Sequence, residues 1–314
     1  TPEPGTQVMF NYLACSGASL EDGIIETDSY DGPENTGVAL ISQVERLRHL
    51  KRGTLPGGTT DRYAGTPVTP DVMMMTAGGN DVGFGRVVET CLVGVDRGSA
   101  KGKVELTDDG TVVIEASIDT CDEVLAPYVA GTYPGFTRVE EGYQRLRDEL
   151  ESEELLPDRG RPGVFLLEYP DVTRNQDGDF EALCAYAMVD DQMQTAYEDI
   201  LLPLNAAVET SAQQHDWVYM RGTMDSFHEH GMCSGDPWIN SLLDSLFGQE
   251  DAQGGMSKHG TMHPNATGFQ EMAAVATPYI DGYLQEYDRD TRVPDIAVDV
   301  RSINGPIEGV GAGA

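Results

Sequence analysis

Lysine is scarce in this sequence, and long apolar runs are missing from it. Only 4 of its 20 basic residues are lysines, and with 53 acidic residues the formal net charge is −33 at pH 7. A surface of that sign repels the phosphates of nucleic acid and of anionic lipids, so neither is an expected partner. No run approaches the roughly 18 apolar residues that a membrane-spanning helix needs, so no transmembrane segment is expected.

The remaining composition is that of a globular protein. The chain has 314 residues, of which 39% are hydrophobic, and its 36 glycines and 17 prolines follow no period. This length suffices to bury a hydrophobic core. The irregular glycine and proline positions exclude collagen-like and coiled-coil classes.

Hydrophobic periodicity divides the chain into alternating strands and helices. Apolar runs predict strands at residues 8–14, 71–77, 163–167 and 217–220, and a hairpin at about 103–117. Helical spacing predicts helices at residues 37–50, 137–156, 189–215 and 266–287.

Alternating strands and helices predict one α/β domain with a parallel sheet. The run Met73–Met75 is continuously apolar, which is typical of a strand buried on both faces. We therefore expect a domain over residues 1–288, with the hairpin as an insertion. Residues 289–314 are rich in Val, Asp, Gly and Pro and are expected to be a tail or linker.

Three motifs occur in an order that matters for function. They are Asn11-Tyr-Leu-Ala-Cys-Ser-Gly-Ala18, Gly78-Gly-Asn-Asp-Val-Gly-Phe84 and Met262-His-Pro-Asn-Ala-Thr-Gly268. The first two follow predicted strands, where α/β sheets place their ligand sites, and the third opens a predicted helix. Together they resemble three conserved blocks of the SGNH, or GDSL-type, family of serine esterases and lipases. The segments Leu167-Glu-Tyr-Pro170 and Cys233-Ser-Gly-Asp-Pro-Trp-Ile239 extend the resemblance to its secreted actinobacterial branch, over roughly residues 7 to 285.

The resemblance implies a three-layer α/β/α sandwich with a flavodoxin-like parallel sheet, and it implies ester hydrolysis. The backbone N–H of Gly17 and the side-chain amide of Asn80 would form the oxyanion hole, and His263 would be the general base. The family usually has an aspartate three residues before that histidine, whereas this chain has Gly260. Some relatives use a Ser-His dyad instead, in which a backbone carbonyl, here that of Thr261, orients the imidazole.

The nucleophile of the family is missing from this sequence. The family's nucleophile is the serine of a Gly-Asp-Ser motif on the first strand, and no Gly-Asp-Ser occurs here. Ser16 corresponds to an ordinary position of the family's block. In the flavodoxin-like topology the first strand is central, so a body that starts at the second strand leaves a slot in its sheet. Unpaired backbone groups along that slot would cost several kcal/mol, so we expect another segment to fill it.

The five cysteines are an odd number. The resemblance implies the disulfides Cys91–Cys121 and Cys184–Cys233, and it leaves Cys15 for a partner in the missing segment. One hypothesis explains the missing serine, strand and cysteine together: an N-terminal piece was cleaved by proteolytic processing and stays attached through Cys15. A buried free thiol at Cys15 is the alternative.

The sequence thus predicts a secreted, disulfide-bonded SGNH-type carboxylic-ester hydrolase without its own nucleophile. The alternative is an inactive SGNH scaffold that acts as a structural or binding subunit of an extracellular or surface assembly. Acylglycerols, phospholipids and acetylated sugars all remain open as substrates. No cofactor is expected, and no metal either, because His228-Glu-His230 lacks a further ligand.

The charge favours a salt-tolerant protein from a marine or other saline source, and an acidic extracellular protein without that adaptation is the alternative. Raising NaCl from near zero to 1 M shortens the Debye length to about 3 Å, so repulsion among the acidic side chains falls. The melting temperature, followed by circular dichroism, should rise over this range. An equal rise with uncharged sucrose of the same osmolality, or no rise with salt, contradicts this origin.

Overall fold

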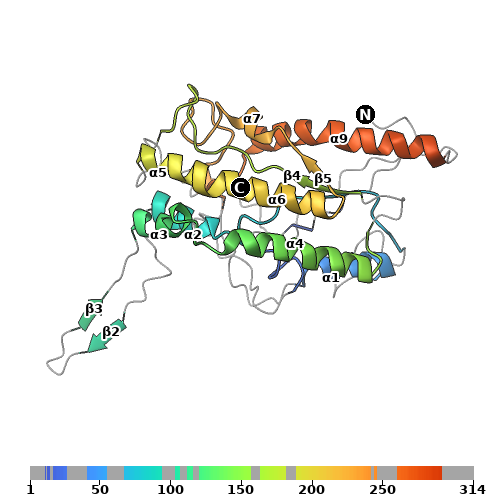
Figure 1. The fold of residues 1–314 in the computed structure, drawn as a ribbon, viewed down its shortest axis with the longest axis horizontal. Coiled ribbons are helices and arrows are strands. Elements are labelled where there is room, and N and C mark those ends of the chain that lie inside the picture. The colour runs from blue at the N-terminus through green and yellow to red at the C-terminus, as the bar shows by residue number, and fades with distance from the viewer. Residues whose placement is uncertain are drawn as a thin grey trace, which may run out of the picture.

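The computed structural model describes residues 11, 13–14, 17–26, 41–54, 67–93, 103–106, 112–115, 120–156, 163–181, 189–241, 244–245 and 260–291. The elements in chain order are α1 (Gln43–Arg52), β1 (Met73–Met75), α2 (Phe84–Val93), β2 (Lys103–Leu106), β3 (Val112–Glu115), α3 (Cys121–Val129), α4 (Gly135–Ser152), β4 (Val164–Leu167), α5 (Asp190–Thr195), the π-helical η1 (Ala196–Leu201), α6 (Leu202–Gln214), β5 (Val218–Met220), α7 (Thr223–Phe227) and α9 (Ala266–Thr291). Figure 1 shows their arrangement.

Three parallel strands form the sheet at the centre of the described fold, in the order β1-β4-β5. Met73 pairs with Val164 and Phe165 with Val218. All four residues of β4 are buried, as expected for the middle strand of a parallel sheet whose side chains are covered on both faces. The mixed α/β class predicted from the sequence is therefore present.

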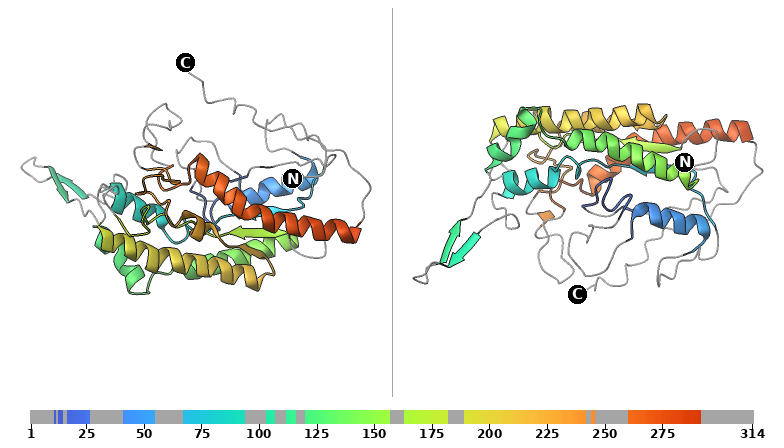
Figure 2. Two further views of the ribbon diagram at one scale, coloured as in Figure 1. Left: turned by 90° about the horizontal axis from the view of Figure 1, so that it is seen from above. Right: turned by 60° about the horizontal axis from the view of Figure 1, so that its bottom comes forward.

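Long helices cover the sheet. In α4 and α6 the buried residues recur at helical spacing, and the two helices pack against each other while α6 also contacts β4 and β5. On α9 the ring of Tyr283 meets that of Phe165 in β4 edge to face, with centroids 5.4 Å apart. Seen from above, the strands lie between α6 and α9 (Figure 2, left).

The helices differ from the sequence-based boundaries at their ends. The predicted helix at 189–215 is a continuous run of α5, η1 and α6, in which residues 196–201 widen to a π-helix. The helix predicted from residue 37 begins at Gln43, because the hydroxyl of Ser42 accepts a hydrogen bond from the Glu45 N–H and caps it.

Three short helices were not predicted. α2, with 10 residues, begins within the glycine-rich motif, α3, with 9 residues, contains Pro127, which disfavours a helix, and α7 has only 5 residues.

The N-terminal strand predicted at 8–14 lies mostly outside the described residues. Its described members, residues 11, 13 and 14, belong to no strand. On the other side of β1 no strand among the described residues pairs with it. Met74, in the middle of β1, keeps 52% of its surface exposed, although it belongs to a strand of the central sheet.

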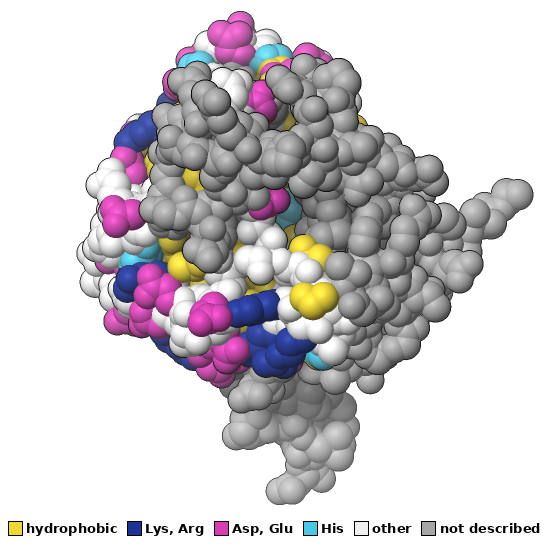
Figure 3. Space-filling model, turned by 90° about the vertical axis from the view of Figure 1, so that its right-hand side faces the viewer, with side chains coloured by type: hydrophobic (Ala, Val, Ile, Leu, Met, Phe, Trp, Pro, Cys, Tyr) yellow, Lys and Arg dark blue, Asp and Glu magenta, His cyan; other side chains and the backbone are white. Residues whose placement is uncertain are grey.

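A cluster of ion pairs attaches α1 to the end of α4. The guanidinium of Arg48 lies 3.0 Å from Glu45, 2.7 Å from Glu149 and 3.7 Å from Glu153. Lys51 donates to the backbone carbonyl of Glu153 at 2.7 Å, where a cation is favoured by the negative end of the α4 dipole. The described part of this side of the molecule shows basic and acidic side chains next to one another (Figure 3).

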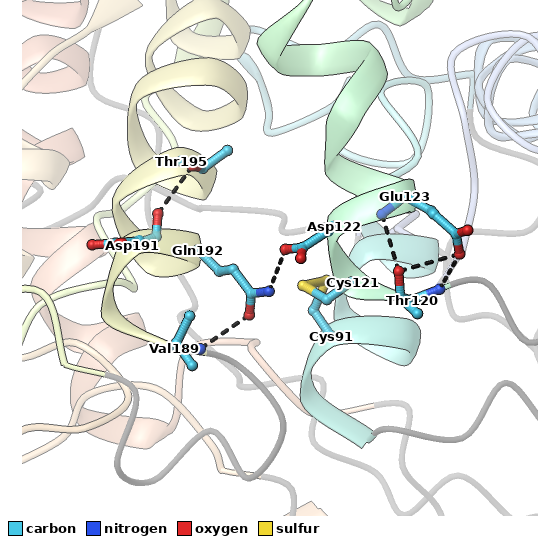
Figure 4. Close-up of a disulfide and its surroundings, with 9 residues drawn as sticks. All are labelled: Cys91, Thr120, Cys121, Asp122, Glu123, Val189, Asp191, Gln192 and Thr195. Carbon is cyan, nitrogen blue, oxygen red and sulfur yellow. Dashed lines mark hydrogen bonds between the residues drawn. A yellow bond between two sulfur atoms is a disulfide. The ribbon is translucent and has the colours of Figure 1, made fainter.

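A disulfide joins α2 to α3 (Figure 4). It links Cys91 and Cys121, which are 30 residues apart, and it is the pairing that the resemblance implies. Closing a loop of that length stabilises a fold by about 3 to 4 kcal/mol in the chain-entropy model. The hairpin of β2 and β3 lies within this loop and projects away from the remaining elements (Figure 1).

The same region is fixed by a capping box. Thr120 accepts from the Glu123 N–H, and the Glu123 carboxylate accepts from the Thr120 N–H. Cys233 is also disulfide-bonded, while Cys184 and Cys15 lie outside the described residues. Within the described residues no helix has both the length and the apolarity to cross a bilayer.

His215 should make stability depend on pH. It is 7% exposed, and its buried Nε2 has no hydrogen-bond partner. Burial and the charge of Arg147 lower its pKa below 6.5, although Asp148 and Glu151 oppose this. Because the folded state disfavours the imidazolium, the unfolded chain takes up the proton first as pH falls below 6.5.

We therefore expect the free energy of unfolding to fall between pH 6.5 and pH 5, and to fall less in a His215→Gln variant. Urea titrations at both pH values measure this difference. The exposed His228→Gln serves as a control, and an equal pH dependence of wild type and His215→Gln contradicts the expectation.

Candidate active site at the carboxyl end of strand β1

A glycine-rich turn follows β1 and leads into α2. Val82 donates from its N–H to the Gly78 carbonyl and Phe84 to that of Gly79. Gly78 has φ of +115°, in a region that favours glycine. A Cβ at Gly78 would also lie 3.2 Å from the side chain of Leu204. This turn places the side chains of Asn80 and Asp81 at the carboxyl end of the strand.

Three tyrosine hydroxyls hold the backbone of this turn. Tyr143, on α4, donates to the Ala77 carbonyl at 2.9 Å, and Tyr128, on α3, donates to that of Val82 at 2.6 Å. Tyr169, just after β4, accepts from the Gly79 N–H at 2.8 Å. Burial raises the pKa of all three phenols, so they stay neutral near pH 7. The turn is thereby fixed by uncharged bonds from three separate elements.

The Gly17 segment lies directly against this turn. The side-chain amide nitrogen of Asn80 donates to the Ala18 carbonyl at 2.9 Å. The Leu20 N–H lies 3.2 Å and 3.1 Å from the two carboxylate oxygens of Asp81. Gly17 itself has φ of +79°. The structure thus brings together two predicted site segments that are about 60 residues apart in sequence, as both contacts show.

Asp81 is the charged group at this contact. Burial, as the largest effect, raises the pKa of its carboxyl, although the Leu20 N–H and the charge of Arg138 favour the ionised form. Arg138 also donates to the Asp81 backbone carbonyl at 3.2 Å. Asp81 is a site residue that the sequence did not single out, although it follows Asn80 directly within the glycine-rich motif.

Two backbone hydrogen bonds with Asn240 hold the loop that carries His263. Asn240 donates from its N–H to the His263 carbonyl at 2.9 Å, and Met262 donates to the Asn240 carbonyl at 3.0 Å. The side chain of Asn265 donates to the Pro237 carbonyl and accepts from the Gly268 N–H at the start of α9. The loop is therefore anchored to residues 237–240 as well as to α9. Asn265 is a second residue that the sequence did not single out.

The imidazole of His263 is exposed, and its Nδ1 lies 3.2 Å from the carbonyl oxygen of Thr261. This is the backbone contact that the resemblance implies for a chain with Gly260 in place of the aspartate. Among the described residues no hydrogen bond joins the His263 ring to a hydroxyl, to Gly17 or to Asn80. Ser16 lies outside the described residues, and the hydroxyl of Ser19 is used within its own turn, where Asp22 N–H donates to it at 3.0 Å.

His228 and His230 do not converge on a common point with other ligands. The ring of His230 stacks on Trp238 with centroids 3.7 Å apart, and its Nδ1 lies 2.9 Å from the Asp236 carbonyl. Within the described part of the chain no three His, Cys, Asp or Glu side chains are close enough to hold a metal ion.

Comparisons with known proteins show no close relative of this chain. No family model matches the chain, and no curated protein matches it. Among solved structures, the chain is similar to an extracellular lipase from Streptomyces rimosus, with 17% sequence identity and a TM-score of 0.40. The match covers 71% of this chain and 73% of the lipase chain. At these values the function of the chain has to be inferred from its own residues and contacts.

The glycine-rich turn should depend on the Tyr169 hydroxyl. A Tyr169→Phe variant leaves the Gly79 N–H without its acceptor, which should cost about 1 to 3 kcal/mol of unfolding free energy in a urea titration. Tyr197→Phe is the matched control, because its ring packs against Phe180 and no backbone group among the described residues bonds to its hydroxyl, so it should change stability by less than about 0.5 kcal/mol. Equal losses in both variants would show that the Gly79 bond contributes nothing.

Proposed function

We propose that this chain is the larger part of a secreted SGNH-type serine hydrolase that cleaves carboxylic esters. The observation that carries the proposal is the contact between the Gly17 segment and Asn80 at the carboxyl end of β1. An ester hydrolase needs donors aimed at the carbonyl oxygen that becomes negative, and both donors expected of this site belong to these two segments.

Asn80 suits this task because its amide has two N–H groups. One of them donates to the Ala18 carbonyl and fixes the orientation of the side chain. The other remains for the substrate oxygen, together with the backbone N–H of Gly17. Neither donor has to gain or lose a proton in the pH range of catalysis, so both are ready before the substrate arrives.

His263 is the proposed general base. With its proton on Nδ1, the ring donates to the Thr261 carbonyl, which leaves Nε2 as the acceptor. In the acylation step, Nε2 takes the proton of a serine hydroxyl while the hydroxyl oxygen attacks the ester carbon. The same nitrogen then protonates the departing alcohol, and a water molecule hydrolyses the acyl-enzyme by the same steps.

We further propose that the nucleophilic serine comes from a segment that adds a strand beside β1. Two observations support this: the second edge of β1 has no partner among the described strands, and Met74 is 52% exposed. A strand there would bring its own carboxyl end next to Asn80. It would also complete the flavodoxin-like sheet and the sandwich, and a bridge to Cys15 would retain the segment.

Secretion is part of the proposal. Cys91 and Cys121 form a disulfide and Cys233 takes part in another, and such bonds persist in oxidising compartments outside the cytosol. The substrate is an ester of an acyl chain or an acetyl group, with acylglycerols, phospholipids and acetylated sugars as the classes to be screened.

A fluorophosphonate probe tests the function on the native protein, purified without reducing agent. The probe should label a serine, and intact mass before and after reduction should show the label on a released peptide that contains Gly-Asp-Ser and one cysteine. Absence of labelling, with a mass near 34.0 kDa that reduction does not change apart from thiols, would contradict the hydrolase. The inactive scaffold subunit would then be the better interpretation.

Substitutions test the individual roles. Asn80→Ala should lower kcat on a p-nitrophenyl ester by about 10²- to 10³-fold, because one oxyanion donor is lost. His263→Ala should lower it by about 10²- to 10⁴-fold. His228→Ala is the control for a histidine in an exposed turn, and it should leave kcat unchanged. Activity that survives His263→Ala contradicts the assignment of the base.

A further inference from the structure

We infer that Asp81 is a positioning residue of this site: its carboxylate holds the Gly17–Leu20 turn against Asn80 and so sets the spacing of the two oxyanion donors. This inference rests on the proposed function. It assigns a role to a residue that is neither nucleophile, base nor oxyanion donor.

The contact has two points. Asn80 and Asp81 are consecutive, and they bind two groups of one turn: the Ala18 carbonyl at 2.9 Å and the Leu20 N–H at 3.1 Å and 3.2 Å. A single hydrogen bond would let the turn pivot about it. Two bonds, one given and one received, fix both the distance and the orientation of the turn.

Asp81 itself is held from its own side. The surrounding turn is fixed by the hydroxyls of Tyr169 and Tyr128, and Arg138 donates to the Asp81 carbonyl. The carboxylate therefore extends from a turn that is itself fixed toward the Leu20 N–H. In this arrangement Asp81 positions the Gly17 segment.

Packing alone gives a coarser restraint. The Leu20 side chain is fully buried and lies under α4, so close to Gly142 that a Cβ there would come within 2.8 Å of it. This anchor holds the turn to the body, and the Ser19 N–H donates to the Asp22 carbonyl within the turn, whereas the direction of the Leu20 N–H is set by Asp81. Since misplacement by about 1 Å can cost 10²-fold in rate, the carboxylate restraint matters for kcat more than for stability.

Two variants separate positioning from charge. Asp81→Ala removes the acceptor of the Leu20 N–H, whereas Asp81→Asn keeps an acceptor oxygen of nearly the same shape and removes the charge. If Asp81 acts by positioning, Asp81→Ala should lower kcat about 10- to 100-fold with KM nearly unchanged. Asp81→Asn should recover most of that loss.

The matched control is Asp148→Ala. Asp148 is an exposed aspartate on α4 whose carboxylate contacts Gln144 and Arg147, so kcat should not change. Hydrogen exchange of the Leu20 amide, measured in the same variants, gives a readout that does not need activity. It should be slow in wild type, faster in Asp81→Ala and close to wild type in Asp81→Asn.

The possible results are distinguishable. Equal losses of kcat in Asp81→Ala and Asp81→Asn would overturn the positioning role in favour of a charge effect. A lower kcat without faster Leu20 exchange in Asp81→Ala, or faster exchange without a lower kcat, would overturn it as well. A wild-type protein that neither hydrolyses esters nor reacts with the fluorophosphonate refutes the proposed function, while the Leu20 exchange data still decide whether the carboxylate holds the turn.

Discussion

The backbone of residues 77–82 is the constraint on which the candidate site depends. This turn leaves the buried sheet at β1 and is bound by hydroxyls of Tyr128, Tyr143 and Tyr169 from three elements. A buried backbone N–H or carbonyl without a partner costs about 1 to 3 kcal/mol, so the tyrosines stabilise one conformation of the turn. Because the turn is rigid, Asn80 can serve as a fixed reference for the segments around it.

Two further segments of the candidate site are held by different sets of contacts. The Gly17 segment docks through side chains of the turn itself. The His263 loop is held independently, through residues 237–240 and the start of α9. The Gly17 segment and the His263 loop are thus each held by their own contacts.

The excess of acidic residues is partly offset by ion pairs at the surface of the molecule. Arg48 and Lys51 lie at the end of α4, among carboxylates and terminal carbonyls, where they offset part of the net charge of −33. At the glycine-rich turn the half-buried Asp81 carboxylate lies near Arg138 and Glu21. Neutral tyrosine hydroxyls hold the glycine-rich turn, whereas charged groups, the Asp81 carboxylate and Arg145, bind the Gly17 segment.

The sequence by itself determined the α/β class, the strands at β1, β4 and β5, and the long helices, because apolar side chains recur with the period of each element. It also singled out Gly17, Asn80 and His263 through local motifs. It did not reveal α2 and α3, which are short, nor the roles of Asp81 and Tyr169. Those roles depend on partners 61 and 90 residues away. Only the tertiary structure decides such pairings, because a hydrogen bond between distant segments leaves no periodic trace in either of them.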